Sequence, residues 1–149
     1  MKNGHLPRTL ITMLNAYSKL AAEREAQGVP ALPLTAEQTK DLTQLLENPP
    51  TDQKQFLLQL LSDRIPPGVD EAAYVKATWL SAVAQGNASS PFVAPLEATR
   101  LLGTIVGGYN VAALIKLLNN SDEELAKCAA QGLSRTLLVY DALDRKSVV

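Results

Sequence analysis

Residues 107–137 read GGYNVAALIKLLNNSDEELAKCAAQGLSRTL, and this stretch indicates the fold class of the whole chain. After the Gly-Gly pair, Asn110 is the predicted N-cap of a short apolar helix that ends at the Asn-Asn pair. Ser121 with Glu124 three positions later has the spacing of a capping box, which predicts the start of a longer helix. Two helices joined by a short polar turn form a helical hairpin. Such a unit needs stacked neighbours to bury its apolar face.

Each helix of this hairpin is expected to turn one apolar stripe inward, because residues three and four positions apart share a helix face. The expected stripe of the first helix is Val111, Leu114, Ile115 and Leu118. The expected stripe of the second helix is Leu125, Ala129, Leu133, Thr136, Leu137 and Tyr140.

The preceding sequence supplies the neighbours that this hairpin needs. Thr35 with Gln38 has the spacing of another capping box, and Thr51 is the predicted cap of the helix that follows Asn48-Pro49-Pro50. Asp70 is the predicted N-cap of one helix. The next helix is expected to start at a proline, Pro91 or Pro95, and to end at Gly107-Gly108. All of these helices follow a first helix that begins near Pro7.

The Leu-Leu pairs at positions 45–46 and 117–118 lie about two helical-hairpin repeats apart, which suggests an internal repeat. No stretch alternates apolar and polar residues as a strand would. We therefore predict one all-α domain over residues 1–149. Its expected architecture is a HEAT-like α-α superhelix of one leading helix and three antiparallel helix pairs.

Composition restricts the classes of function. The chain is 46% hydrophobic and 19% charged, as in globular proteins, and its formal net charge is −1 with a pI near 5.8. This charge argues against a nucleic-acid partner, which usually needs a basic patch. A single cysteine indicates a reducing compartment. The N-terminus lacks a long apolar segment, so we expect a cytoplasmic protein without membrane contact.

The sequence assigns no catalytic, cofactor-binding or metal-binding residue. His5 is the only histidine and precedes the first helix, and Cys128 is the only cysteine and is expected to be a partly buried small hydrophobe. The acidic run 122–124 has the position of carboxylates that complement a helix dipole, with a metal or acid–base role as the alternative. Trp79 has the spacing of a core residue, with a ligand platform as the alternative.

Three segments resemble one family, the N-terminal domain of the bacterial B-type aconitate hydratases. They are residues 45–86 (LLENPPTDQKQFLLQLLSDRIPPGVDEAAYVKATWLSAVAQG), 101–118 (LLGTIVGGYNVAALIKLL) and 133–141 (LSRTLLVYD). The resemblance covers about residues 10–144. It implies a HEAT-like helical domain joined to a swivelling domain and a catalytic body, with roles in protein–protein contacts, dimer formation and access to the active site.

The resemblance also implies an enzyme that interconverts citrate and isocitrate on a [4Fe–4S] cluster. The cluster cysteines and substrate-binding residues of that family lie beyond the segment that this chain resembles, so none of them is carried over to a position here.

Three functions follow as hypotheses. The first is a non-catalytic interaction module whose protein partner is a second copy, as a homodimer, or a metabolic enzyme such as an aconitase. The second is part of an aconitate hydratase whose catalytic domains are absent from this chain. The third is an RNA-binding regulatory domain, because the resemblance implies that the family binds messenger RNA after losing its cluster; the acidic pI argues against it.

The last helix offers a candidate interaction surface. From Leu137 the sequence reads LLVYDAL, and a helix that is apolar on more than one face is normally buried on each of them. We predict that Leu138, Val139 and Ala142 are covered by a second copy or a partner enzyme. The alternative is that the apolar tail, Val148-Val149, covers them within the chain.

The cysteine count gives the first testable prediction. The purified chain should bind no iron and should not hydrate cis-aconitate, because a [4Fe–4S] cluster needs several cysteine thiolates and the sequence has one. Elemental analysis and a hydratase assay, after removal of contaminating aconitase, measure both. Iron-dependent turnover above the buffer rate would contradict this prediction.

Overall fold

The computed structural model describes residues 8–50, 53–68 and 70–147, and within these ranges the surroundings of side chains from residue 12 to residue 136. The described residues form seven helices and no strand, which confirms the prediction of an all-α protein. The helices are α1 (Arg8–Ala26), α2 (Ala36–Glu47), α3 (Lys54–Asp63), α4 (Glu71–Ala84), α5 (Pro95–Leu102), α6 (Val111–Leu117) and α7 (Glu123–Ser147).

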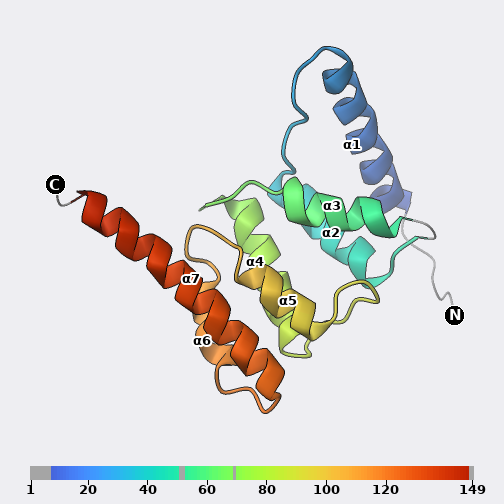
Figure 1. Cartoon of the computed structure of the whole chain (residues 1–149). Coiled ribbons are helices and arrows are strands. Elements are labelled where there is room, and N and C mark those ends of the chain that lie inside the picture. Colours follow the sequence, from blue (N-terminus) through green and yellow to red (C-terminus); the bar gives the residue numbers. More distant parts are fainter. Residues whose placement is uncertain (1–7, 51–52, 69, 148–149) are drawn as a thin grey trace, which may run out of the picture.

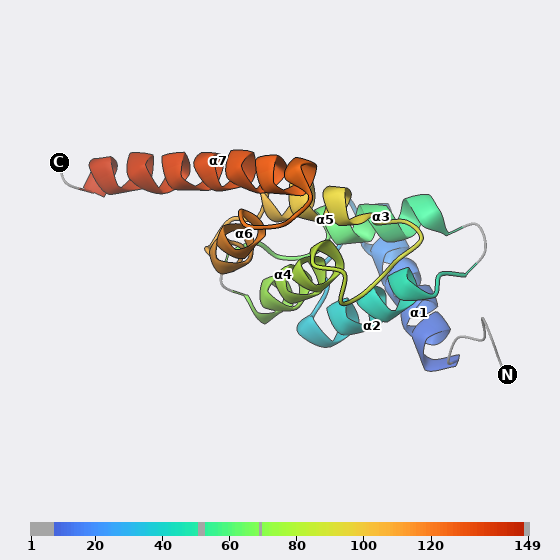
Figure 2. The ribbon, with the colours of Figure 1, turned by 90° about the horizontal axis from the view of Figure 1, so that it is seen from below.

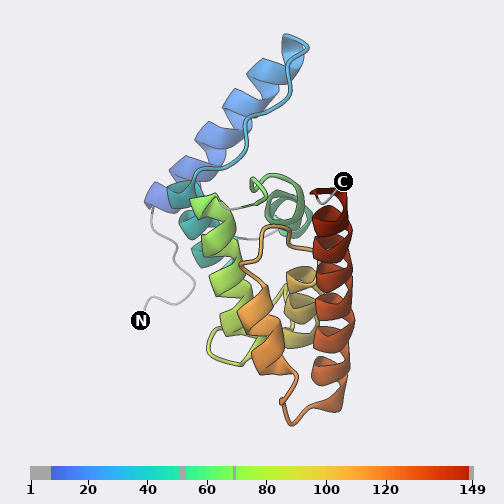
Figure 3. The ribbon, with the colours of Figure 1, turned by 90° about the vertical axis from the view of Figure 1, so that its left-hand side faces the viewer.

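The helices form a stack with α1 at one end and α6 and α7 at the other (Figures 1 and 3). Helix α2 contacts α1, α3 and α4, and α4 packs against α5. Helices α5 and α6 both pack against α7. Leucine fills the core at fully buried positions on α2, α3, α4, α5 and α6: Leu42, Leu45, Leu57, Leu61, Leu80, Leu102 and Leu114.

Three predicted helix starts are confirmed. The Thr35 hydroxyl accepts a hydrogen bond from the Gln38 amide, and the Gln38 side chain accepts one from the Thr35 amide. The Asp70 carboxylate accepts a hydrogen bond from the Ala72 amide at the start of α4. Of the two candidate prolines, Pro95 is the first residue of α5. Thr51 lies outside the described residues, and α3 begins after Gln53.

The predicted start of α7 is wrong by one residue. Asp122, not Ser121, accepts a hydrogen bond from the Glu124 amide, and its own carbonyl accepts the first helical bond, from the Ala126 amide. The Asn120 side chain accepts a hydrogen bond from the Asp122 amide and so orders the turn before the cap. A carboxylate satisfies the exposed amides at a helix start and also complements the helix dipole, which a hydroxyl does not.

The end of α5 and the inward stripe of α6 also differ from expectation. Helix α5 ends at Leu102, and residues 103–110 form a loop, although the helix was expected to continue to Gly107-Gly108. On α6 the buried residues are Leu114 and Leu117, whereas Ile115 is 50% exposed and Leu118 is 39% exposed. The suggested repeat therefore fails in detail, because both members of the pair at 45–46 are buried but only the first member of the pair at 117–118 is.

Two glycines set the distance between α5 and α7. A Cβ atom added to Gly132 would lie 2.8 Å from the Cα atom of Gly103, and one added to Gly103 would lie 2.9 Å from the Cα atom of Gly132. Real Cβ atoms do not approach backbone this closely, so any side chain at either position would push the two backbones apart. The helices are close because both residues lack a side chain.

The α6 assignment gives a paired prediction. Leu117→Ala should lower the free energy of unfolding by about 2–5 kcal/mol, because Leu117 is 1% exposed and its truncation leaves a cavity. Leu118→Ala should cost about 1 kcal/mol or less, because part of that side chain is already in water. Chemical denaturation of both variants measures the difference. Equal losses would show that the inward face of α6 is assigned wrongly.

Candidate functional site

The predicted interaction surface lies on the C-terminal half of α7. In this helix Leu125 and Ala129 are buried, and so is Thr136, which is 8% exposed. The backbone positions of Leu138, Val139 and Ala142 follow, in the half of the helix that extends past α5 and α6 (Figures 1 and 2). The side chains of these three residues lie outside the described part of the chain, so their surface stays a prediction.

A second apolar surface was not found by sequence reasoning. Tyr74 on α4 and Tyr109 in the loop before α6 meet edge to face, with ring centroids 5.3 Å apart and an angle of 75° between the rings. Tyr74 is 55% exposed and Val106, in the same loop as Tyr109, is 57% exposed. Aromatic rings in water are a common feature of surfaces that bind proteins. The contact depends on the path of the 103–110 loop. Part of this loop was expected to be helix, so the contact could not be predicted from the sequence.

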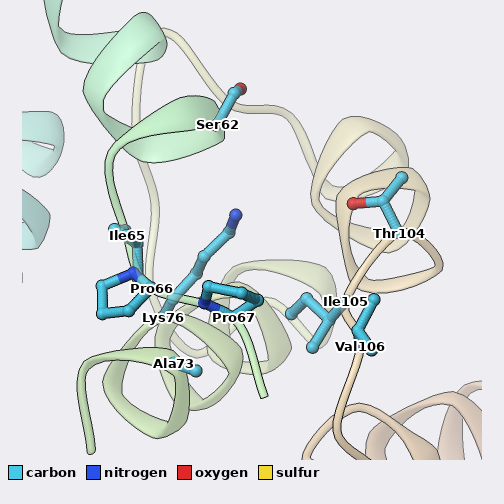
Figure 4. A pocket seen from close by; sticks show the side chains of 9 residues that line it. All are labelled: Ser62, Ile65, Pro66, Pro67, Ala73, Lys76, Thr104, Ile105 and Val106. Carbon is cyan, nitrogen blue, oxygen red and sulfur yellow. The ribbon is translucent and has the colours of Figure 1, made fainter. Parts of the chain in front are cut away.

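A cavity of about 240 Å³ lies between the C-terminal end of α3, the start of α4 and the loop after α5. Its walls are mainly apolar: Ile65, Pro66, Pro67, Ala73, Ile105 and Val106. Ser62 and Thr104 place hydroxyl groups at its edge, and the Lys76 side chain extends into the space between these two residues (Figure 4). The lysine comes from α4, the helix that packs against both α2 and α5.

The backbone around this cavity is held by a contact between two loops. The Gly68 amide donates a hydrogen bond of 3.1 Å to the Val106 carbonyl. Gly107 has a φ of +110°, and a Cβ atom there would lie 2.3 Å from the Gly68 carbonyl oxygen. Only glycine allows this approach, so Gly107, which the sequence marked as a helix break, also holds the loop after α5 against the loop before α4.

Lys76 is only 9% exposed, although lysine side chains in water carry a positive charge at neutral pH. The salt bridges within the described residues are Arg64 with Glu25 and Arg100 with Glu97, so no described carboxylate lies within 4.0 Å of the Lys76 ammonium. Burial lowers the pKa of Lys76 from its usual value, and the negative charge of Asp63 opposes that shift. The remaining residues that line the cavity carry no titratable side chain. The ammonium is therefore poorly compensated by this chain.

The structure assigns other singled-out residues to packing. Trp79 is 7% exposed, and its indole N–H donates a hydrogen bond of 2.8 Å to the Glu47 carboxylate, which favours the core interpretation over a ligand platform. Cys128 is partly buried and unpaired, as expected. A [4Fe–4S] cluster takes several cysteine thiolates, so a chain with one cysteine does not fit that cofactor. Among the described residues no group of three or more His, Cys, Asp and Glu side chains could hold a metal ion.

Within the described ranges, no helix combines the length and the apolar character needed to cross a bilayer. The architecture is that of a small all-helical domain with capped helices, a leucine-rich core and apolar surfaces at its edges. The chain belongs to the family described as the Aconitate B N-terminal domain, which it matches over residues 16–148.

Whole proteins of similar sequence support this membership. The chain is 55% identical over 87% of its length to aconitate hydratase B of Pseudomonas aeruginosa. It is 53% identical over 87% of its length to that of Escherichia coli, and 52% identical over 89% to that of Synechocystis sp.. In each comparison the chain spans only 15% of the length of the relative. The resemblance seen in the sequence is thereby confirmed, and it concerns one domain of a much longer protein.

The environment of Lys76 predicts an unusual pH dependence of stability. Since the folded-state pKa is lowered, the unfolded chain binds more protons between that pKa and the unfolded value near 10.4, and stability rises with pH through this window. Lys76→Met keeps an unbranched side chain and removes the charge. It should therefore melt at a higher temperature than the native chain at pH 7, and the difference should shrink as the pH approaches 10.

Thermal unfolding followed by circular dichroism at several pH values measures this difference. Lys116→Met is the matched control, because Lys116 is exposed on α6. A Lys76→Met variant that melts below the native chain at pH 7 would show that the ammonium is well compensated after all.

Proposed function

We propose that the chain is a non-catalytic accessory domain that docks onto other domains of an aconitate hydratase in the cytoplasm. The observation that carries the proposal is the match to an N-terminal domain family whose curated relatives are several times longer than this chain. In those relatives the residues equivalent to this chain are followed by most of the protein. A domain in that setting has neighbours to contact, and the chemistry of citrate and isocitrate belongs to them.

The shape of α7 supports the proposal. This helix has 25 residues, whereas the two helices that pack against it, α5 and α6, have 8 and 7. Its N-terminal half packs against both of them, and its C-terminal half continues beyond (Figure 2). The sequence of that half is apolar at four successive positions, 137–140. Burial of apolar surface is the main favourable term in association, so this half of α7 is the proposed docking element.

The order of contacts among the helices supports a HEAT-like superhelix as the finer architecture. Each pair that is adjacent in sequence, α2 with α3, α4 with α5 and α6 with α7, is also in contact, and successive pairs touch through α2 with α4 and α5 with α7. Stacked helical pairs give extended surfaces suited to protein partners. A second copy of the chain is the alternative occupant of the α7 surface.

The test is a substitution in the projecting half of α7. Leu138→Arg should leave the helix content unchanged but should weaken binding to the catalytic remainder of an aconitate hydratase B by about tenfold or more, the effect of losing about 1.4 kcal/mol. Gln131→Arg is the matched control, because Gln131 is exposed on the N-terminal half of the same helix. Calorimetry with the separately purified remainder measures binding, and light scattering measures self-association.

Three results are distinguishable. Loss of binding to the remainder in Leu138→Arg alone supports docking within an aconitase. Loss of self-association alone indicates a homodimer through the same surface. If the native chain is a monomer that does not bind the remainder, or if both variants bind equally well, α7 is not the docking element.

A further inference from the structure

The cavity around Lys76 is a better candidate for a ligand site than two other cavities of the described chain. A cavity of about 210 Å³ between α1 and α3 is bordered by Arg64, which has Glu25 at 4.0 Å as a counter-ion. One of about 290 Å³ between α4 and α6 is bordered by Lys116, which is exposed to water. Of these three cavities, only this one receives a buried cation that has no described carboxylate within 4.0 Å.

We propose that this cavity binds a carboxylate group carried on a short apolar stem, with the Lys76 ammonium as its counter-ion. The proposal does not depend on the docking function of α7. It starts from the geometry in Figure 4, in which the lysine extends past the two prolines into the space bordered by Ser62 and Thr104. A carboxylate there would supply the compensation that the chain itself lacks.

A structural explanation of the lysine has to account for its burial. Long cationic side chains commonly pass along apolar surface and keep the ammonium in water. Lys76 packs its stem in this way and 9% of the residue stays exposed, but no described carboxylate lies within 4.0 Å of its ammonium. Buried charges in proteins are normally paired, because an isolated charge costs far more to bury than a hydrogen-bonded pair. An anion that enters the cavity would pair the Lys76 charge and would account for its place in the fold.

The walls select the kind of anion. One ammonium and the nearby negative charge of Asp63 suit a single negative charge better than two, which disfavours a phosphate dianion. The Thr104 hydroxyl donates its proton to the Leu101 carbonyl, so its oxygen is left as an acceptor rather than a donor for the anion. The side chains of Ile65, Pro66, Ile105 and Val106 favour a hydrocarbon stem behind the carboxylate.

The size of the cavity permits such a ligand. A cavity of about 150 Å³ in another protein already accommodates benzene, and this one measures about 240 Å³. A short aliphatic acid or a glutamate side chain is smaller than this volume. Both ligands present a carboxylate, one as a free organic acid and the other as an acidic side chain of a protein. The experiment below tests each of them separately.

The experiment is a titration of the purified chain followed by NMR of the Lys76 side chain and of the methyl groups of Ile65, Ala73 and Ile105. Butyrate tests the free acid, and butanol is its neutral counterpart. N-acetyl-glutamate amide tests the protein side chain, and the glutamine compound is its neutral counterpart. Inorganic phosphate tests a general anion site.

Saturable shifts with butyrate, at a dissociation constant of about 1–10 mM, together with a raised Lys76 pKa in the bound state, support a site for a free acid. Saturable shifts with the glutamate compound but not with butyrate support a site for an acidic side chain. In either case Lys76→Met should weaken binding by about tenfold or more, while Lys116→Met should not change it. The rise in the pKa of Lys76 is measured on the native chain, so it does not depend on how well the variant folds.

Three results would overturn the proposal. Equal shifts with butanol and butyrate would show an apolar cavity in which the lysine has no role. Phosphate binding as tight as butyrate binding would show a site without preference for a carboxylate. The absence of saturation with every probe would show that the lysine is tolerated in the fold without a ligand.

Discussion

The side chain of Asn110 connects three of the elements that make up the C-terminal half of the stack. This residue is fully buried, and its amide group donates hydrogen bonds of 2.7 Å to the Leu102 carbonyl and 3.3 Å to the Thr136 hydroxyl. The first acceptor is the last residue of α5 and the second lies on α7, while the Asn110 carbonyl accepts the first helical bond of α6 from the Leu114 amide. The hydrogen bonds of Asn110 fix the path of the 103–110 loop. This loop in turn positions Tyr109 against Tyr74 and forms one wall of the Lys76 cavity. Among the described residues the Asn110 Oδ1 atom finds no hydrogen-bond partner, a cost of about 1–3 kcal/mol that the fold tolerates at this position.

Local signals in the sequence were sufficient where the structure is set by neighbouring residues. The capping box of Thr35 and Gln38 involves four consecutive positions, and the Asp70 cap involves three, so both could be predicted without knowledge of the fold. Asn110 shows the opposite case. It stands at the N-cap of α6 as predicted, yet its side chain makes no capping bond because the distant α5 and α7 compete for its amide group. A residue type that fits a local motif does not reveal a stronger partner elsewhere in the chain.

The same reasoning explains which parts of the candidate sites were missed. Periodicity placed Leu114 correctly but wrongly put Leu118 rather than Leu117 on the inward stripe, because adjacent apolar residues fit the pattern equally and only the position of α7 selects one of them. Lys76 carries no motif at all. It lies in a helix whose other buried residues are mostly small or apolar, and it is enclosed only because α3 and the loop after α5 meet over it. Burial of a charge by tertiary packing has no counterpart in the spacing of residues along the chain.

The close contact of Gly103 and Gly132 has a mechanical consequence for α7. The two backbones are in direct contact there without intervening side chains, so this crossing is a pivot point about which α7 can tilt relative to α5. From Gly132 to Ser147 the helix axis runs for about 22 Å, given its rise of about 1.5 Å per residue. A tilt of about 10° at this crossing would therefore displace the C-terminal end of α7 by about 4 Å. A small change in the angle between α5 and α7 would thus be amplified into a much larger movement of the C-terminal half of α7.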